Sequence, residues 1–424
     1  MPKPVVIVGA GLAGLACARE LQRAGIYYLL LDASDRPGGR LKTDIVEGFR
    51  LDRGFQVLFT AYPNADEVVD FDTLELGTFE KGAGIYDGGQ TVYLAPKASF
   101  FDRLKLLKTH ILSLHDLKLL MAWGQKADAM SMAEISRLND ETAHDALRHF
   151  GFSDDFIRKF ARPFYGSVFA DDELKTSKRQ LEFVTKMIAE GQTGLPKDGM
   201  EAIPRQMAAE LHRYLFRMGS RVSELVYKDG YVSGVRLDTS ETIEAAAVVV
   251  ATEADEASRL TGLSTVEGYN SSTTVYFETP VACAPTASIV LNGTGHGRVL
   301  EVVPVSQAQP SYAPPGRHLA AATMVGEAPE DDATLAKLVQ DEVAPWFPQG
   351  NVGRWHFLGA YRVRYHQMLQ TPGVLARLPQ NTTERPGLYF AGEFTENASI
   401  DGAIRSGVSC GQALVSDLSR REVA

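Results

Sequence analysis

Residues 5–32 read VVIVGAGLAGLACARELQRAGIYYLLLD, and this stretch decides the fold class. Residues 5–8 form a short apolar run of the kind that builds buried parallel strands. Residues 12–24 carry apolar side chains at helical spacing and stop before Gly25, and residues 27–31 form a second apolar run. The order strand, helix, strand predicts a βαβ unit with a parallel sheet.

The turn between the first strand and the helix carries glycines at positions 9, 11 and 14. Gly9 permits a tight turn, Gly11 lets backbone N–H groups approach a pyrophosphate, and Gly14 lets the helix pack close to the strand. The phosphate then meets the positive end of the helix dipole. Asp32, at the tip of the second strand, is placed to accept hydrogen bonds from an adenosine ribose, and its charge disfavours the 2′-phosphate of NADP. The pattern predicts a dinucleotide site.

The residues that follow Asp32 favour FAD over NAD as the dinucleotide. Pro37-Gly38-Gly39-Arg40 comes soon after it, and a plain NAD dehydrogenase has no need of this element. The two glycines let the backbone approach a ligand, and Arg40 places a planar cation on a phosphate or on the flavin edge. Taken alone, a surface turn with a solvated arginine explains these four residues equally well.

Beyond the βαβ unit, the chain changes character several times. Residues 100–190 carry apolar side chains at helical period and predict a helical segment. Asp229-Gly230 predicts a hairpin turn, and residues 245–251 predict a further buried strand. A largely antiparallel sheet is expected from residues 273–278, 287–291, 299–305 and 318–325. A helix at 331–346, a strand at 355–365, a short strand at 388–391 and a last helix at 402–418 are expected to follow.

Composition narrows the function classes. The 424 residues include 53 acidic and 43 basic side chains, so the formal charge of −10 argues against a nucleic-acid partner. The three cysteines lie far apart and match no zinc spacing, which predicts a reduced cytoplasmic protein without a metal site. The lysine-bearing helix expected over residues 102–120 leaves peripheral membrane contact open, although a packed helix with a solvated face explains it equally well.

Three separated blocks make the sequence similar to a known superfamily. They are GAGLAGL with LLDASDRPGGRLKT, then GLPKDGMEAIP with the strand at Val222 and the run AAAVVVAT, and finally LYFAGEFTENASIDGAIRSG. The chain resembles the FAD-dependent superfamily of amine oxidases, protoporphyrinogen oxidases and phytoene and carotene desaturases, and it lies nearer the desaturase-like branch.

The resemblance implies a noncovalent FAD site assembled from all three blocks. Asp32 takes the position of the family's ribose-binding acid, which is usually Glu, and Glu393 stands where the family has Asp. Arg40 would lie near the pyrophosphate and ribityl chain, and Val222 would contact the adenine edge. The implied cofactor residues are Gly9, Gly11, Leu12, Ala13, Gly14, Asp32, Ala33, Gly39, Arg40, Val222, Gly392, Glu393, Ile400, Asp401 and Ala403.

The last helix has a physical reason to begin beside the flavin. Reduction by hydride places negative charge on the flavin N1–C2=O edge, and a helix N-terminus at Ile400 and Asp401 stabilises it. A packing helix for which Asp401 serves only as a cap has the same sequence.

The substrate side is less defined by the sequence. Amine oxidases of the superfamily place an aromatic residue where this chain has Ser399, and this departure counts against ordinary amine oxidation. Arg53, Phe55 and Gln56 are expected beside the flavin, because their segment follows the Gly-Gly-Arg element in the family, and strand packing is an equal alternative for Phe55. Tyr165 is a candidate for a substrate passage, and Trp355 and Tyr361 face either the flavin or the core.

These observations predict an α/β protein with a discontinuous Rossmann-type FAD-binding domain and an α+β substrate domain. The expected FAD-binding parts are residues 1–75, 195–262 and 375–424, and the substrate domain takes 76–194 and 263–374, with its helical part at about 100–190.

The expected function is an FAD-dependent oxidoreductase that removes a hydride from an apolar or conjugated small molecule. The alternatives are an amine oxidase that produces an imine and hydrogen peroxide, and a flavin-bound sensor or assembly protein without turnover. The sequence does not decide whether oxygen or a quinone is the electron acceptor.

Overall fold

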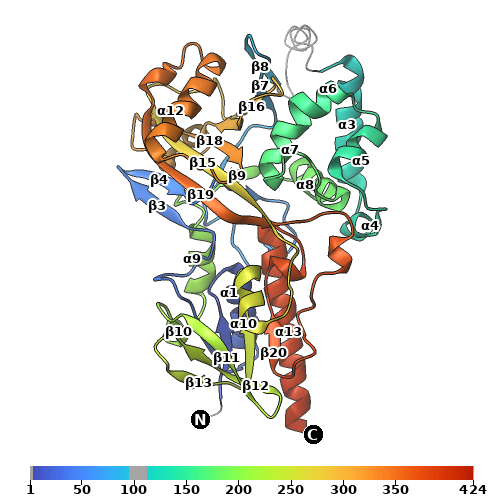
Figure 1. The fold of residues 1–424 in the computed structure, drawn as a ribbon, viewed down its shortest axis with the longest axis vertical. Helices are drawn as coiled ribbons and strands as arrows, with labels where there is room; N and C mark the ends of the chain where they lie inside the picture. Colours follow the sequence, from blue (N-terminus) through green and yellow to red (C-terminus); the bar gives the residue numbers. More distant parts are fainter. Residues whose placement is uncertain (1–2, 95–111, 424) are drawn as a thin grey trace.

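A computed structural model describes residues 3–94 and 112–423. Two large sheets dominate it (Figure 1): a parallel sheet in the lower part, near both chain ends, and a mixed sheet in the upper part, beside a group of helices. The α/β class predicted from the sequence is confirmed. The domain boundaries stay a prediction, and the part of the expected helix 102–120 before residue 112 lies outside the described residues.

The described strands of the parallel sheet come from segments far apart in the sequence. In spatial order they are β10 (Phe216–Arg217), β2 (Tyr28–Leu31), β1 (Val5–Val8), β14 (Ala247–Val250) and β20 (Leu388–Phe390). Every neighbouring pair is parallel, and β1 and β14 are buried along their whole length, as their apolar runs predicted.

Two helices pack tightly against each other beside this sheet. Helix α1 (Leu12–Arg23) follows β1, and helix α13 (Ile400–Val423) closes the chain. A Cβ added at Gly407 would fall 2.2 Å from the carbonyl oxygen of Ala13, so the two backbones meet at a place where no side chain fits. This contact fixes the start of α13 relative to the glycine turn before α1.

The mixed sheet carries the strands that the sequence predicted for an antiparallel sheet. Within the described residues its order is β19 (His356–Met368), β15 (Tyr269–Thr279), β18 (His318–Val325), β17 (Val299–Val303), β16 (Ile289–Asn292), β7 (Ala83–Tyr86) and β8 (Thr91–Leu94). The pairing of β16 with β7 is parallel, and the others are antiparallel. The sequence analysis did not predict β7 and β8, because each is only four residues long and the distant partner of β7, strand β16, lies about two hundred residues away.

Helices cover the two faces of this sheet differently. On one face, Leu335 and Val339 of α12 (Asp332–Val343) pack in a core with Val275 and Ala322. On the other face, α7 (Arg162–Phe169) contacts β17 and β18. Among the described residues, the upper part also contains the α-helices α3 (Leu114–Ala129), α4 (Met132–Arg137), α5 (Ala143–Phe150), α6 (Asp154–Phe156), α8 (Lys178–Glu190) and α11 (Val305–Ala308).

Smaller sheets and further helices accompany the two large sheets. The predicted turn at Asp229-Gly230 joins the first two strands of the sheet β11 (Val222–Lys228), β12 (Tyr231–Leu237) and β13 (Thr242–Glu244). The other elements are the hairpin β3 (Thr43–Val46) and β4 (Phe49–Asp52), the sheet β5 (Leu58–Phe59), β9 (Thr193–Leu195) and β6 (Gly77–Thr78), and helices α9 (Ala202–Ala209) and α10 (Ala254–Thr261). Among the described residues, no helix combines the length and the apolar character needed to cross a membrane.

Candidate functional site

A cavity of about 720 Å³ reaches from the parallel sheet to the mixed sheet. The segments that leave the carboxyl ends of β1, β2 and β14 form its cofactor wall, together with residues 38–42, Glu393 and the start of α13. Residues of α7, α8, β15, β17, β18 and β19 form its substrate wall. In open α/β sheets ligands bind beyond the carboxyl ends of the strands, and this cavity lies at such an edge.

The glycine turn of the cofactor wall gives each glycine a separate role. Gly9 has φ +114°, and a Cβ on it would lie 2.5 Å from the Ala251 carbonyl oxygen. Gly14 does not line the cavity, because its Cα faces the Gly9 carbonyl oxygen at a distance that admits no side chain. Gly11 faces open space, and the nearest atom to its added Cβ is the Gly39 Cα at 3.8 Å.

The start of α1 offers donors to this space. Gly11, Leu12 and Ala13 line the cavity, and their N–H groups have no hydrogen-bond partner within the described part of the chain. The first N–H groups of a helix need such partners from outside the helix. The turn therefore presents an anion site built from backbone alone.

Asp32 is held in place by its neighbours at the edge of the cavity. Its Oδ2 accepts a hydrogen bond from the Ala10 N–H at 2.7 Å, and its Oδ1 accepts from the Ser34 N–H and hydroxyl at 2.8 and 2.5 Å. These bonds fix the carboxylate next to Ala33, which also lines the cavity. Val222, for which the resemblance implies a contact with the adenine edge, also lines the cavity.

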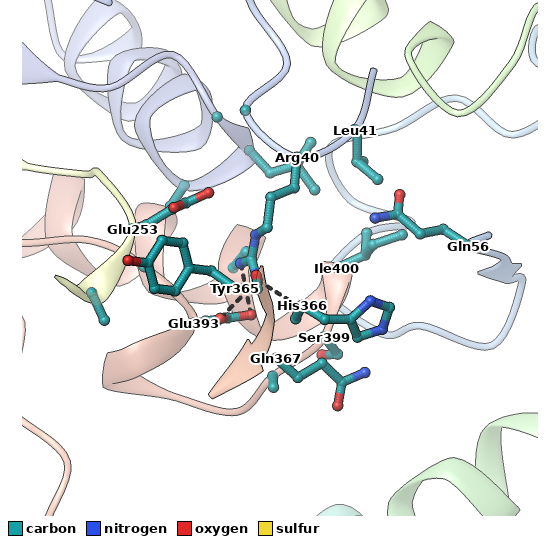
Figure 2. A pocket seen from close by; sticks show the side chains of 18 of the residues that line it. Arg40, Leu41, Gln56, Glu253, Tyr365, His366, Gln367, Glu393, Ser399 and Ile400 are labelled. Carbon is teal, nitrogen blue, oxygen red and sulfur yellow. Dashed lines mark hydrogen bonds and ion pairs between the residues drawn. The ribbon is translucent and has the colours of Figure 1, made fainter. Parts of the chain in front are cut away.

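Arg40 and Glu393 pair with each other across the cofactor wall (Figure 2). Two parallel contacts of 2.9 and 2.8 Å join the guanidinium to the carboxylate, and Arg40 also donates to the His366 carbonyl oxygen at 2.9 Å. Burial acts to lower the pKa of Arg40, but the Glu393 charge outweighs it and raises that pKa above its ordinary value. The resemblance implies that both Arg40 and Glu393 lie at the cofactor. Their pairing neutralises the charge of Glu393, which would otherwise repel a diphosphate.

Glu253 is a residue of this wall that the sequence analysis missed. It follows β14 directly and lies near the Arg40–Glu393 pair (Figure 2). Burial raises the pKa of Glu253, against the pull of the Arg40 charge. Its position at the carboxyl end of the run 245–251 was the signal that could have identified it.

The start of α13 meets the cavity through Ser399, Ile400 and Ala403. Ser399 caps the helix, since its hydroxyl accepts the Gly402 N–H at 2.8 Å. The N–H groups of Ile400 and Asp401 have no partner among residues 3–94 and 112–423. This helix end therefore directs free donors toward the cavity.

Asp401, expected at the cofactor, turns its side chain away from the cavity. Its Oδ1 accepts the N–H groups of Asn64 and Ala65 at 2.7 and 3.1 Å, and its Oδ2 accepts the Asn64 side-chain amide at 2.7 Å. The carboxylate thus ties the segment after β5 to the first turn of α13.

The cofactor wall fits FAD. The glycine turn leaves a space that a Cβ on Gly11 would fill, and free N–H groups face it from two helix ends. Gln56 lines the cavity between these ends, and its buried Oε1 accepts no hydrogen bond from the described residues. An isoalloxazine ring carries an N–H donor for such an acceptor. Bound FAD supplies a hydride acceptor.

The substrate wall carries polar groups that the sequence analysis did not identify. Glu301 on β17 is buried and lies beside Ser167 of α7 and Thr323 of β18. His366 on β19 contacts the Ser272 hydroxyl through Nδ1 at 2.8 Å (its ring is drawn in Figure 2). Burial lowers the pKa of His366 to about 4, and the Arg40 charge acts in the same direction.

The residues expected at the substrate fall into two groups. Phe55 and Ser399 line the cavity, but Tyr165, Trp355 and Tyr361 do not. Tyr165 is buried, with its hydroxyl 2.9 Å from the Thr185 hydroxyl, and its ring stacks on Phe169.

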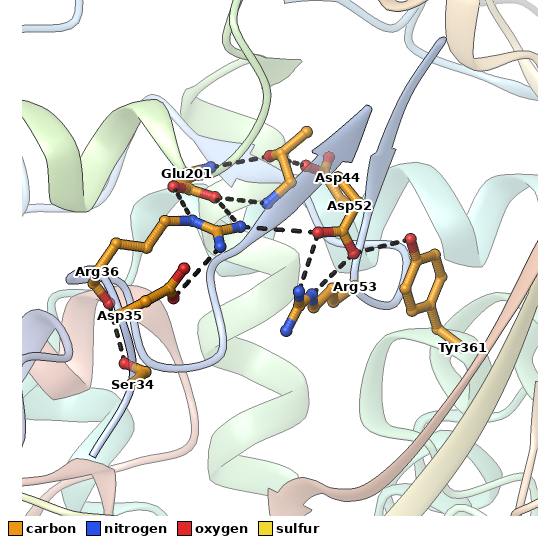
Figure 3. Close-up of polar contacts among 9 residues, drawn as sticks. Ser34, Asp35, Arg36, Asp44, Asp52, Arg53, Glu201 and Tyr361 are labelled. Carbon is orange, nitrogen blue, oxygen red and sulfur yellow. Dashed lines mark hydrogen bonds and ion pairs between the residues drawn. The ribbon is translucent and has the colours of Figure 1, made fainter. Parts of the chain in front are cut away.

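Trp355 and Tyr361 are engaged elsewhere in the fold. Trp355 donates its indole N–H to the Gly350 carbonyl oxygen at 3.0 Å within the α12 core. Tyr361 donates its hydroxyl to Asp44 at 3.0 Å (Figure 3). Asp44 also pairs with Arg53 at 2.8 Å, and Arg36 contacts Asp44 at 3.6 Å while pairing with Glu201 at 2.7 Å. This network holds the loop 34–40 against the β3–β4 hairpin.

The chain is similar to several known proteins. Residues 12–415 match the model of the family described as flavin containing amine oxidoreductase. A putrescine oxidase of Kocuria rosea is 41% identical over 95 residues, which is 22% of this chain and 18% of that protein. A lycopene-forming phytoene desaturase of Pantoea ananas is 48% identical over 56 residues, 13% of this chain and 11% of that one. These local matches span less than a fifth of either relative.

Solved structures resemble the whole chain. A putative protoporphyrinogen oxidase from Exiguobacterium has a TM-score of 0.73 at 17% identity, with 98% of this chain and 99% of that one covered. Wild-type putrescine oxidase bound to putrescine has a TM-score of 0.72 at 16% identity, with the same coverage. At this identity the likeness establishes the fold. The family match over residues 12–415 goes further: the chain belongs to the flavin-containing amine oxidoreductase family, the class of FAD-dependent oxidoreductases that its sequence predicted.

Proposed function

We propose that the protein removes a hydride from a carbon atom of an apolar or conjugated small molecule and passes it to bound FAD. The observation that carries this proposal is the wall next to the start of α13. Ser399 stands there, and its hydroxyl is occupied by the Gly402 N–H and by the Asn397 side chain at 2.5 Å. Neither a ring nor a free polar group is available at this position to hold a charged amine beside the flavin.

Part of the remaining lining supports an apolar substrate body. Rings and aliphatic side chains line the cavity beside the polar groups of the substrate wall, and they would keep water away from the reacting carbon. They are Phe55, Val57, Phe59, Tyr62, Val168, Phe169, Val184, Met324 and Val325.

The chain's own residues then bind and orient the reactants. The free N–H groups at the start of α1 would hold the diphosphate, and the Arg40–Glu393 pair would keep the adjoining wall neutral. The free N–H groups of Ile400 and Asp401 would stabilise the negative charge that develops at the flavin during hydride transfer. No protein nucleophile is required.

Amine oxidation is the second candidate, because a putrescine oxidase is among the relatives and among the matching folds. Anaerobic stopped-flow spectroscopy of the oxidised holoenzyme separates the two. We expect a polyene or a porphyrinogen to bleach the flavin band faster than benzylamine or putrescine at matched concentration. Rapid bleaching by a simple amine would overturn the proposal in favour of the amine oxidase. A flavin inert to both classes, yet reduced by dithionite, would point to a protein without turnover.

A further inference from the structure

The substrate wall contains a carboxyl group that neither the fold nor the FAD site requires. Glu301 is 5% exposed and lines the cavity from β17. It lies on the face of the mixed sheet that α7 covers, opposite the α12 core. A buried carboxyl group with no ionic partner is costly, so its presence in an otherwise well-packed sheet calls for a reason.

The two oxygens of this carboxyl group have different surroundings. Ser167 Oγ lies 2.5 Å from Oε1, and Thr323 Oγ1 lies 3.2 Å from the same atom. The second oxygen, Oε2, has no hydrogen-bond partner within the described part of the chain, although the residue borders the cavity. Because two hydroxyl donors saturate Oε1, a proton on the carboxyl group resides on Oε2.

Burial is the largest influence on the charge state of Glu301. Burial raises the pKa of Glu301 to about 7, and the two groups that oppose this rise, Ser167 and Thr323, are uncharged. On the substrate wall His366 is neutral at this pH, since its pKa is lowered to about 4. The charged groups of the cavity lie on the cofactor wall: Asp32, Arg40, Lys42, Arg221, Glu253, Asp255, Glu256 and Glu393.

We propose that Glu301, with Ser167 and Thr323, is a binding subsite that donates a hydrogen bond to a carbonyl or similar neutral oxygen of the substrate. The inference rests on the proposed function and refines it: the substrate is an apolar molecule with one oxygen acceptor placed away from the reacting carbon. An apolar body would exclude water from the subsite and favour the protonated, donating form. A hydrocarbon without such an oxygen would leave the donor unsatisfied.

Three probes of one shape test the proposal on the oxidised holoenzyme: 2-acetylnaphthalene, 2-ethylnaphthalene and 1-(2-naphthyl)ethylamine. Binding is measured by calorimetry and by the flavin difference spectrum, neither of which requires turnover. At about pH 6 we expect the ketone to bind about tenfold more tightly than the hydrocarbon, as one additional hydrogen bond allows. At about pH 8.5 this preference should disappear, because the deprotonated group no longer donates.

Variants distinguish donation from simple packing. Glu301→Gln keeps an N–H donor, so the ketone preference should persist and become independent of pH. Glu301→Leu should abolish the preference. Thr323→Val removes a bond that lowers the pKa of Glu301 and should move the pH midpoint upward, which serves as the test if the leucine variant does not fold. Glu278→Gln, whose carboxylate pairs with Arg317 outside the cavity, is the matched control and should behave like the wild type.

Three results would overturn the proposal. Equal binding of ketone and hydrocarbon to the wild type would show that Glu301 does not act as a donor. The same conclusion would follow if the wild type prefers the ketone but Glu301→Gln and Glu301→Leu both lose this preference fully. The amine could instead bind more tightly than the other two probes at about pH 8.5 and lose this advantage in Glu301→Gln. That result would show that Glu301 binds an ammonium group as a carboxylate and does not act as a hydrogen-bond donor. If flavin bleaching by polyenes persists in any of these cases, the subsite fails while the proposed function stands.

Discussion

The cofactor wall of the cavity combines backbone N–H groups with charged side chains, whereas its substrate wall presents side chains that meet from distant segments. On the cofactor wall the N–H groups at the starts of α1 and α13, placed by glycines and by strand ends, have no hydrogen-bond partner among the described residues. On the substrate wall Glu301, Ser167 and Thr323 meet from two strands and a helix. Backbone geometry is set by local sequence, but this side-chain cluster depends on how distant segments pack. Substitutions should therefore act differently on the two walls.

The largest effect is expected for Gly11→Val on the cofactor wall. A valine side chain would occupy the approach to the free N–H groups, so FAD affinity should fall by at least about 100-fold, or about 3 kcal/mol. The fold should survive, because Gly11 has a negative φ of −77° and open space around it. Calorimetric titration of the apoprotein with FAD measures the change. Gly124→Val, at another open glycine position far from the cavity, is the control and should bind FAD normally.

The Arg40–Glu393 pair tests whether the cofactor wall needs charge balance. Arg40→Met would leave the Glu393 carboxylate nearly buried without its partner, so the free energy of unfolding of the apoprotein should fall by about 3 kcal/mol. Adding Glu393→Gln should restore much of that loss. Urea unfolding of the two variants gives the comparison, and a double variant as unstable as the single one would show that the pair does not balance charge here.

A smaller effect, with a distinct pH dependence, is expected from Glu301. Its pKa of about 7 in the folded state exceeds that of an unfolded glutamate, so the folded state binds more protons between about pH 4.5 and 7. Stability from this group is present at low pH and is lost, by up to about 3 kcal/mol, as the pH rises through that window. Glu301→Gln should remove this decline.

The difference between wild type and Glu301→Gln isolates this contribution. His366, with its lowered pKa of about 4, has the opposite sign, since its stability contribution is lost as the pH falls below about 6.5. That contribution is common to both proteins and cancels. Chemical unfolding across the window is the measurement, and parallel pH profiles for the two proteins would contradict the assignment.

The smallest effect is expected for Tyr361→Phe, a position outside both walls. Removing its hydroxyl breaks one hydrogen bond to the partly exposed Asp44, so unfolding free energy should change by about 1 kcal/mol or less. The absorption spectrum of the bound flavin should not change. A shifted flavin spectrum would place this residue at the cofactor after all.

The sequence predicted the cofactor wall far better than the substrate wall. The turn at residues 9–14 and the start of α13 depend on local spacing, and both are found at the cavity. Ser167 and Glu301 are 134 residues apart, and no local pattern shows that they meet. For Trp355 and Tyr361 the sequence could not decide which face they occupy, because each step along a strand reverses the side-chain direction.

Two further features escaped the sequence for related reasons. Strand β7 pairs with β16, which is distant in the chain, and its own composition is weakly strand-like. Asp401 occupies a position of the superfamily's C-terminal motif. Its carboxylate nevertheless accepts hydrogen bonds from Asn64 and Ala65, and this contact depends on the path of the loop after β5.

A crystal structure of the holoprotein is the decisive test of the division into a cofactor wall and a substrate wall. We expect one FAD in the cavity, with its diphosphate on the N–H groups of Gly11 to Ala13 and its isoalloxazine ring between Gln56 and the start of α13. The substrate wall should remain free to admit a second molecule. An FAD whose ring lies outside the cavity, or whose diphosphate avoids the glycine turn, would contradict the division into two walls.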